Sequence, residues 1–124
     1  MYSNGYNIYK TNSVNYASKE QMLLMLVDGA VKFTKIGRQA ILDRDIQKAH
    51  NSLMRSQEIF TELIVSLDTD KAEWVKPLRD VYFFIKEKLA EANMKKDEKK
   101  VDEVLELIEE IRDMWHEAYK ISKR

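Results

Sequence analysis

The sequence predicts an all-α protein, an antiparallel up-down-up-down four-helix bundle with an extended N-terminal segment. Only three glycines and one proline interrupt the 124 residues, so long stretches lack the residues that break helices. Apolar residues recur at helical spacing over four segments, 18–42, 45–67, 71–94 and 98–121. The turns between these segments are short, which makes consecutive helices antiparallel. We therefore predict one bundle over residues 18–124.

The composition argues against several classes of function. Lys and Arg number 21 and so do Asp and Glu, which leaves no net charge to attract nucleic acid or an anionic membrane. The chain has no cysteine, so it forms neither a disulfide framework nor a thiolate metal site. The N-terminus lacks a secretory signal pattern, and no apolar run approaches the roughly 18 residues that span a bilayer. We expect a cytoplasmic protein with no nucleic-acid partner and no stable membrane association.

Residues 1–17 differ from the rest of the chain. They hold four of the six tyrosines and a single charged residue, Lys10, and they show no helical period. A frayed terminus is one interpretation. The aromatic content favours another, because solvated tails are usually charged and poor in aromatic residues. On that interpretation the segment is a mobile cap in which Tyr6, Tyr9 and Tyr16 cover apolar surface.

The first helix, 18–42, is apolar around most of its circumference. Ser18 and Gln21 form the Ser-x-x-Gln pattern of a capping box. Gly29 and Gly37 lie on the wide apolar face, which indicates close approach of a neighbouring backbone. That neighbour is either another helix of the same chain or a foreign helix in a groove. The main apolar face consists of Met22, Met25, Leu26, Ala30, Phe33, Ile36 and Ala40.

The second helix follows a short turn and has Asp45 as its predicted N-cap. Met54 and Val65 lie away from its apolar stripe, on another face. The stripe itself consists of Ile46, Ala49, Leu53, Phe60, Ile64 and Leu67, with Ile59 and Leu63 beside it.

The third helix has an uncertain start, because Pro77 cannot lie deep inside a regular helix. Asp70 with Glu73 is a plausible cap, followed either by a separate helical turn or by a bend at the proline. The expected core stripe is Trp74, Leu78, Val81, Ile85, Leu89 and Ala92, with Tyr82 beside it. Phe83 and Phe84 point away from this stripe, and adjacent side chains cannot both face one core.

The fourth helix follows a charged connector with Asp97 as its predicted cap. Its apolar residues have the alternating three- and four-residue spacing of a bundle helix. They are Val101, Val104, Ile108, Ile111, Trp115 and Ala118, and Leu107 and Met114 form a second row.

No pattern of catalytic residues is present in the sequence. A di-iron bundle requires two Glu-x-x-His pairs, whereas Asp113 and His116 make a single incomplete match and Gln47 precedes His50. There is no His-Glu-x-x-His motif and no glycine-rich phosphate loop. We therefore predict no catalytic residue, no metal, no cofactor and no enzymatic activity.

The helices carry more apolar surface than one bundle core consumes, and such patches usually mark interaction sites. The surplus residues are Leu24, Val31, Met54, Val65, Phe83 and Phe84. This surplus favours a protein that binds another protein.

Four segments after the tyrosine-rich N-terminus carry a recognisable pattern. They are ASKEQMLLMLVDGA at 17–30, ELIVSLD at 62–68, VYFFI at 81–85 with LAEAN at 89–93, and IRDMWHEA at 111–118. In this order and spacing they resemble the flagellin export chaperone family (FliS). The chain departs from the usual pattern at Val27, where the family has tyrosine, and at Lys19, where it often has proline.

The resemblance implies a cytoplasmic bundle that binds the C-terminal segment of flagellin, prevents its polymerisation and assists flagellar type III export. Export-apparatus or regulatory proteins are further expected partners. Disordered segments that dock as amphipathic helices require apolar grooves. Face geometry and family position together predict the groove residues Leu23, Leu24, Val27, Ala30, Val31, Met54, Val65, Tyr82, Phe83 and Phe84.

Two alternatives use the same apolar surface. The first is a helical adaptor for a different secreted or regulatory protein. The second is a structural homodimer, in which a second copy of the chain consumes the surplus apolar rows.

Overall fold

The computed structural model describes residues 19–68 and 70–123, which form four helices. These are α2 (Lys19–Leu42), α3 (Ile46–Ser66), α4 (Val75–Lys95) and α5 (Glu98–Ser122). The described residues contain no strand, so the predicted all-α class is confirmed. Ser18 and the tyrosines at positions 6, 9 and 16 lie outside the described residues.

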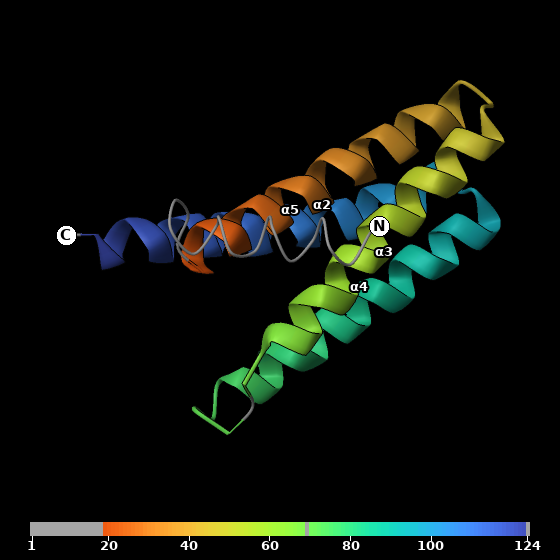
Figure 1. Cartoon of the computed structure of the whole chain (residues 1–124). Coiled ribbons are helices and arrows are strands. Elements are labelled where there is room, and N and C mark those ends of the chain that lie inside the picture. Colours follow the sequence, from red (N-terminus) through yellow and green to blue (C-terminus); the bar gives the residue numbers. More distant parts are fainter. Residues whose placement is uncertain (1–18, 69, 124) are drawn as a thin grey trace, which may run out of the picture.

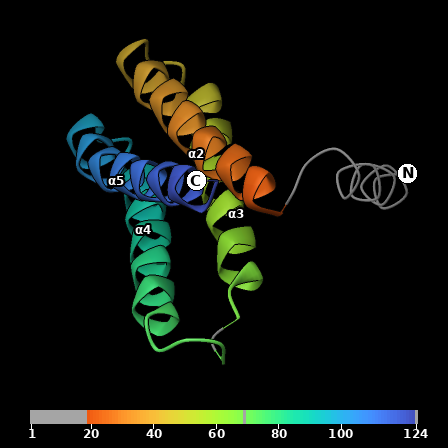
Figure 2. The same cartoon turned by 90° about the vertical axis from the view of Figure 1, so that its left-hand side faces the viewer.

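The helices run back and forth as an antiparallel bundle (Figure 1). The α2–α3 and α4–α5 turns lie at one end of the molecule. The connection between α3 and α4 lies apart from the beginning of α2 and the end of α5, as Figures 1 and 2 both show. Each helix packs against its two neighbours around the ring α2, α3, α4, α5. No helix in the described part of the chain combines the length and apolar composition needed to cross a membrane.

Two predicted N-caps are confirmed. The carboxylate of Asp45 accepts a hydrogen bond from the backbone N–H of Lys48 (3.1 Å) at the start of α3. The carboxylate of Asp97 accepts one from the N–H of Lys99 (2.9 Å) at the start of α5. Each bond satisfies an N–H that has no partner inside its helix.

The predicted cap of the third helix is wrong. Helix α4 begins at Val75 with Trp74 as its N-cap residue, and no side chain caps it. Asp70 instead donates its backbone N–H to the side chain of Asp68 (3.2 Å), which closes a turn before the helix. Pro77 lies in the first turn of α4, where its missing N–H costs no intrahelical hydrogen bond.

All four helices contribute to one apolar core, and its largest fully buried side chains include Phe60 and Tyr82. Their rings meet edge to face with centroids 5.8 Å apart. Five side chains that the periodicity assigned to apolar stripes are exposed instead, namely Met25, Ile46, Trp74, Val81 and Ala118. On α2 the buried face is centred on small residues, Ala30, Thr34 and Gly37, rather than on the methionines.

Helix α3 makes the close approach to α2 that the two glycines predict. A Cβ atom at Gly37 would lie 2.7 Å from Cδ2 of Leu53, and one at Gly29 would lie 3.3 Å from Cδ1 of Ile59. Between these points the hydroxyls of Thr34 and Ser56 are 2.9 Å apart and buried. The glycine face therefore packs against a helix of the same chain.

Candidate functional site

The flank of α4 beside α5 carries a concentration of exposed apolar side chains. Trp74, the N-cap residue of α4, is 59% exposed and Phe84 is 47% exposed, and the exposed Val81 lies between them in the sequence. Residues 81 and 84 are three apart, so they lie on one side of α4. Leu107 and Met114, seven apart, likewise share one side of α5. These rows are candidates for contact with a partner.

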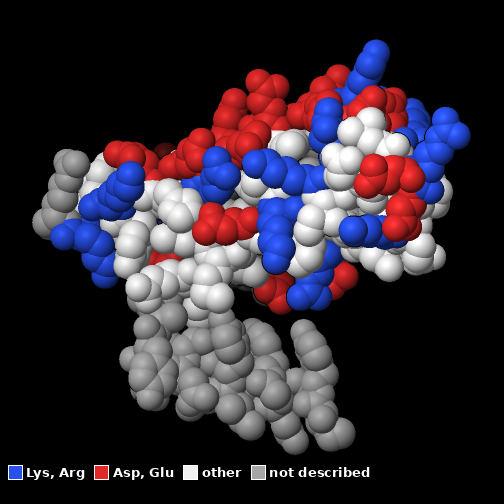
Figure 3. Space-filling model, turned by 90° about the horizontal axis from the view of Figure 1, so that it is seen from above, with Lys and Arg blue, Asp and Glu red and all other residues white. Residues whose placement is uncertain are grey.

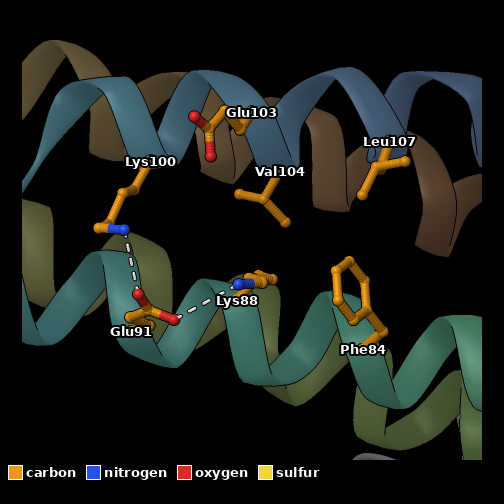
Figure 4. Close-up of a pocket in the computed structure, with 7 residues that line it drawn as sticks. All are labelled: Phe84, Lys88, Glu91, Lys100, Glu103, Val104 and Leu107. Atoms are coloured by element: carbon orange, nitrogen blue, oxygen red, sulfur yellow. Dashed lines mark ion pairs between the residues drawn. The ribbon is translucent and has the colours of Figure 1, made fainter.

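A hollow of about 320 Å³ opens between the two helices (Figure 4). We call it the α4–α5 groove. Its lining residues are Phe84, Lys88 and Glu91 on α4, and Lys100, Glu103, Val104 and Leu107 on α5. Among the neighbouring pairs of helices, α4 and α5 pack least closely.

One end of the groove is apolar. Figure 4 shows Phe84 of α4 opposite Leu107 of α5, with Val104 beside them. Water beside apolar walls is displaced favourably by an apolar side chain, at about 25 cal/mol per Å² of apolar surface buried. This end is therefore suited to an apolar anchor from a partner.

The other end of the groove is charged. The carboxylate of Glu91 lies 3.1 Å from Nζ of Lys100 and 3.6 Å from Nζ of Lys88 and of Lys95. The hydrogen bond from Lys100 and the positive charges around it lower the pKa of Glu91. The same bond raises the pKa of Lys100. Both groups stay ionised at neutral pH, so the groove has a permanently charged end.

An aromatic cluster holds α4 and α5 together nearer the start of α4. The rings of Trp74 and Trp115 lie with centroids 6.4 Å apart. The indole N–H of Trp115 donates to the hydroxyl oxygen of Tyr82 (2.8 Å). Burial raises the pKa of Tyr82 to about 12, although the bond from Trp115 opposes this shift. The phenol is therefore neutral at ordinary pH and accepts the hydrogen bond of Trp115, whose ring contacts the exposed Trp74.

The interface of α2 with α5 is closed by polar contacts instead. Arg38 pairs with Asp102 and lies 3.8 Å from Glu98, and Lys35 lies 3.7 Å from Glu109. The hydrogen bond that Arg38 donates to Asp102 raises the pKa of Arg38. Seen from above in Figure 3, acidic side chains gather along one edge of the molecule and basic side chains intersperse the rest.

A further polar contact closes the same interface nearer the C-terminus. His116 on α5 hydrogen-bonds Asp28 on α2, with 2.7 Å between Nε2 and Oδ1. Neither histidine of the chain belongs to a metal site in the structure, because the described residues contain no group of three or more His, Cys, Asp and Glu side chains placed to hold an ion.

The structure does not gather the ten predicted groove residues on one surface. Val27, Ala30, Val31 and Tyr82 are buried in the core of the bundle. The expectation that Val31 is surplus apolar surface is therefore wrong, because α2 turns this side chain toward the core. Leu23 and Leu24 are half-buried.

The exposed members of the predicted set lie apart from one another. Met54 and Val65 are exposed on α3, Val65 to 79%. Phe83 and Phe84 both lie off the core face of α4, although their adjacency required this of only one of them. Phe84 faces the α4–α5 groove, whereas Phe83 lies under Arg79, whose guanidinium is 5.3 Å from the ring centroid.

Sequence reasoning missed the charged half of the groove. The sequence did place Leu107 in a second apolar row of its helix, because it lies seven residues before Met114. Lys88, Glu91 and Lys100 carried no such signal, because isolated Lys and Glu residues on a helix usually belong to a solvated face. Only the packing of α4 against α5 brings them together.

Comparison with known proteins places the chain in a family. The family described as "Flagellar protein FliS" matches residues 2–122. The chain belongs to this family. The resemblance stated from the sequence is thereby confirmed.

Relatives named "Flagellar secretion chaperone FliS" match most of the chain. The Bacillus subtilis (strain 168) protein is 31% identical over 98% of this chain and 90% of its own length. The Campylobacter jejuni protein is 29% identical over 92% of this chain and 90% of its own length. The Escherichia coli (strain K12) protein is 31% identical over 86% of this chain and 80% of its own length. Membership of FliS supports a role as a flagellar export chaperone rather than as an enzyme.

Proposed function

We propose that this FliS protein is a cytoplasmic chaperone that binds the disordered C-terminal segment of flagellin. Bound flagellin is held back from polymerising and is passed to the flagellar type III export machinery. Export-apparatus or regulatory proteins would then meet the loaded chaperone. Family membership supports the export role, and the apolar end of the α4–α5 groove is the observation that supports capture of a segment.

The mechanism follows from the geometry of the groove. A disordered segment gains a helix when its apolar face enters a hydrophobic groove between two helices. The free energy of burying the anchor between Phe84 and Leu107 offsets part of the entropy lost on ordering. Val81 and Met114 extend the apolar contact beyond the hollow. Exposed Met54 and Val65 on α3 and Phe83 on α4 offer separate apolar contacts to a segment long enough to wrap around the bundle.

We propose that the N-terminal residues compete with flagellin for this apolar surface. In our proposal Tyr6, Tyr9 and Tyr16 cover apolar surface in the free chaperone and are displaced by flagellin. Deletion of residues 1–15 should then tighten flagellin binding or promote self-association of the exposed bundle. A deletion variant that changes neither property would exclude the cap.

Calorimetric titration with a peptide spanning the C-terminal segment of flagellin tests the function. We expect binding with a large negative heat-capacity change and a gain of helix, the signature of coupled folding. Phe84→Asp should abolish or strongly weaken this binding. Met94→Asp is the matched control, since Met94 is exposed on the same helix but does not line the groove. An absence of binding by the unmodified chain would contradict the flagellin assignment.

A further inference from the structure

At the charged end of the α4–α5 groove, the carboxylate of Glu91 has several lysine partners. Glu91 is shared by Lys88, Lys95 and Lys100, at distances of 3.1 to 3.6 Å. Glu103 is the second acid in the lining. Within the lining, Lys88 and Lys100 are matched by Glu91 and Glu103, so the groove carries no excess charge. Glu91 nevertheless has three ammonium partners, so a ligand carboxylate can pair with Lys88 while Glu91 keeps the other two.

Lys88 joins the two ends of the groove (Figure 4). Its Nζ atom lies 5.4 Å from the centre of the Phe84 ring and 3.6 Å from Glu91. The side chain is 46% exposed, so it remains accessible to a ligand. An apolar anchor seated against Phe84 would bring the adjacent turn of a bound helix close to this ammonium group.

The ammonium group of Lys88 can change its partner from Glu91 to a ligand carboxylate at little cost in free energy. If its ammonium group turns toward an incoming carboxylate, Glu91 keeps Lys95 and Lys100 as partners. Lys100 is the nearest of the three, at 3.1 Å. No carboxylate is left unpaired by the exchange, so the attraction to the ligand is not cancelled within the protein.

We propose that the α4–α5 groove selects an amphipathic helix with a carboxylate one helical turn from its apolar anchor, and that Lys88 recognises this carboxylate. The inference rests on the proposed function and deepens it, because it states which pattern in a flagellin segment the groove accepts. The anchor supplies most of the affinity, and Lys88 supplies the selectivity. Exposed ion pairs contribute little each, so selectivity of a few-fold is expected.

Two synthetic peptides of about 18 residues test the pattern directly, a length at which isolated helices begin to form. Both peptides have the same apolar face. One carries Glu and the other carries Lys, in each case one helical turn before and one turn after the anchor. A peptide bound in either direction therefore places a charged residue near Lys88. Acetylated and amidated ends remove the terminal charges. Binding is followed by the amide shifts of the full-length protein in an NMR titration, which detects weak complexes.

We expect the Glu peptide to bind about 3- to 10-fold more tightly than the Lys peptide at low salt, and the difference to shrink as salt screens it. Lys88→Gln should abolish the preference and Lys88→Glu should reverse it. Lys76→Glu is the matched control. It makes the same charge change on the same helix, and residue 76 is exposed and does not line the groove.

Equal binding of the two peptides would overturn the inference, as would a preference that survives Lys88→Glu. So would the absence of shifts at Phe84 and Leu107 with both peptides. These outcomes are distinct from failure of the proposed function, which the flagellin titration decides separately. Flagellin binding without any peptide preference would retain the chaperone role and remove the role of Lys88.

Discussion

The α2–α3 and α4–α5 interfaces are both formed by consecutive antiparallel helices, yet they pack in opposite ways. On α2 the positions that face α3 are small, and a single Cβ atom added at Gly37 would collide with Leu53. Along α4–α5 the facing positions include Phe84 and Leu107, and a hollow of about 320 Å³ separates them. Small residues let backbones approach, whereas large residues at the rim keep the helices apart.

The difference in packing assigns a different role to each interface. The α2–α3 interface is filled by the chain itself, including the buried hydroxyls of Thr34 and Ser56, so it stabilises the fold. The α4–α5 interface leaves apolar side chains incompletely covered, so it keeps surface available for a partner. A comparison of substitutions at the two interfaces tests this division.

The largest expected effect contrasts two phenylalanines. Phe60 is fully buried and Phe84 is 47% exposed. Phe60→Ala should lower the free energy of unfolding by about 3–5 kcal/mol because it leaves a cavity in the core. Phe84→Ala should lower it by less than about 1 kcal/mol, since the side chain lines an open groove. Urea unfolding of both variants measures the contrast. Losses of similar size would show that the groove is part of the core.

The next effect concerns Tyr82 under the α4–α5 interface. Its pKa is raised to about 12 in the folded protein, so the unfolded chain ionises first as the pH rises. Ionisation of this phenol does not affect the free energy of unfolding below about pH 10. As the pH rises toward 12, it lowers that free energy by up to about 3 kcal/mol. Tyr82→Phe removes this ionisation. We expect the stability difference between the two proteins to fall over that range.

Thermal unfolding of the two proteins at several alkaline pH values measures the difference. Both proteins retain the same lysines, whose titration cancels in the comparison. A difference that stays constant from pH 9 to pH 11 would contradict the burial of the Tyr82 hydroxyl. Below that range Tyr82→Phe should cost about 1 kcal/mol, because Trp115 loses its acceptor.

The smallest effect distinguishes the two glycines of α2. Gly37→Ala should destabilise the protein by about 1–2 kcal/mol, because the new methyl meets both Cγ and Cδ2 of buried Leu53. Gly29→Ala meets only the terminal methyl of Ile59, at 3.3 Å. There the gain in helix propensity, about 1 kcal/mol, should leave the protein unchanged or more stable. Denaturant midpoints of the pair measure the sign, and equal stabilisation would contradict the tight packing at Gly37.

Sequence reasoning succeeded where the local pattern was sufficient. Asp45 and Asp97 were identifiable as caps because a side chain next to a helix start bonds backbone atoms within three residues. It failed at Asp70, where a competing turn at Asp68 uses the same backbone N–H. It also placed Trp74 and Val81 in the core, because apolar character at helical spacing does not distinguish the centre of a buried face from its edge.

The sequence by itself determined the helices, their antiparallel order and the close approach at the glycines, because these follow from periodicity, turn length and residue size within short stretches. The resemblance to FliS was also readable from four segments of the chain, and the family match bears it out. The tertiary structure alone decided how far each helix is rotated about its axis. That rotation buries Val31 and Tyr82, exposes Trp74, and brings Lys88, Glu91 and Lys100 to one end of a groove. Such a grouping depends on contacts between residues distant in sequence, which no local pattern encodes.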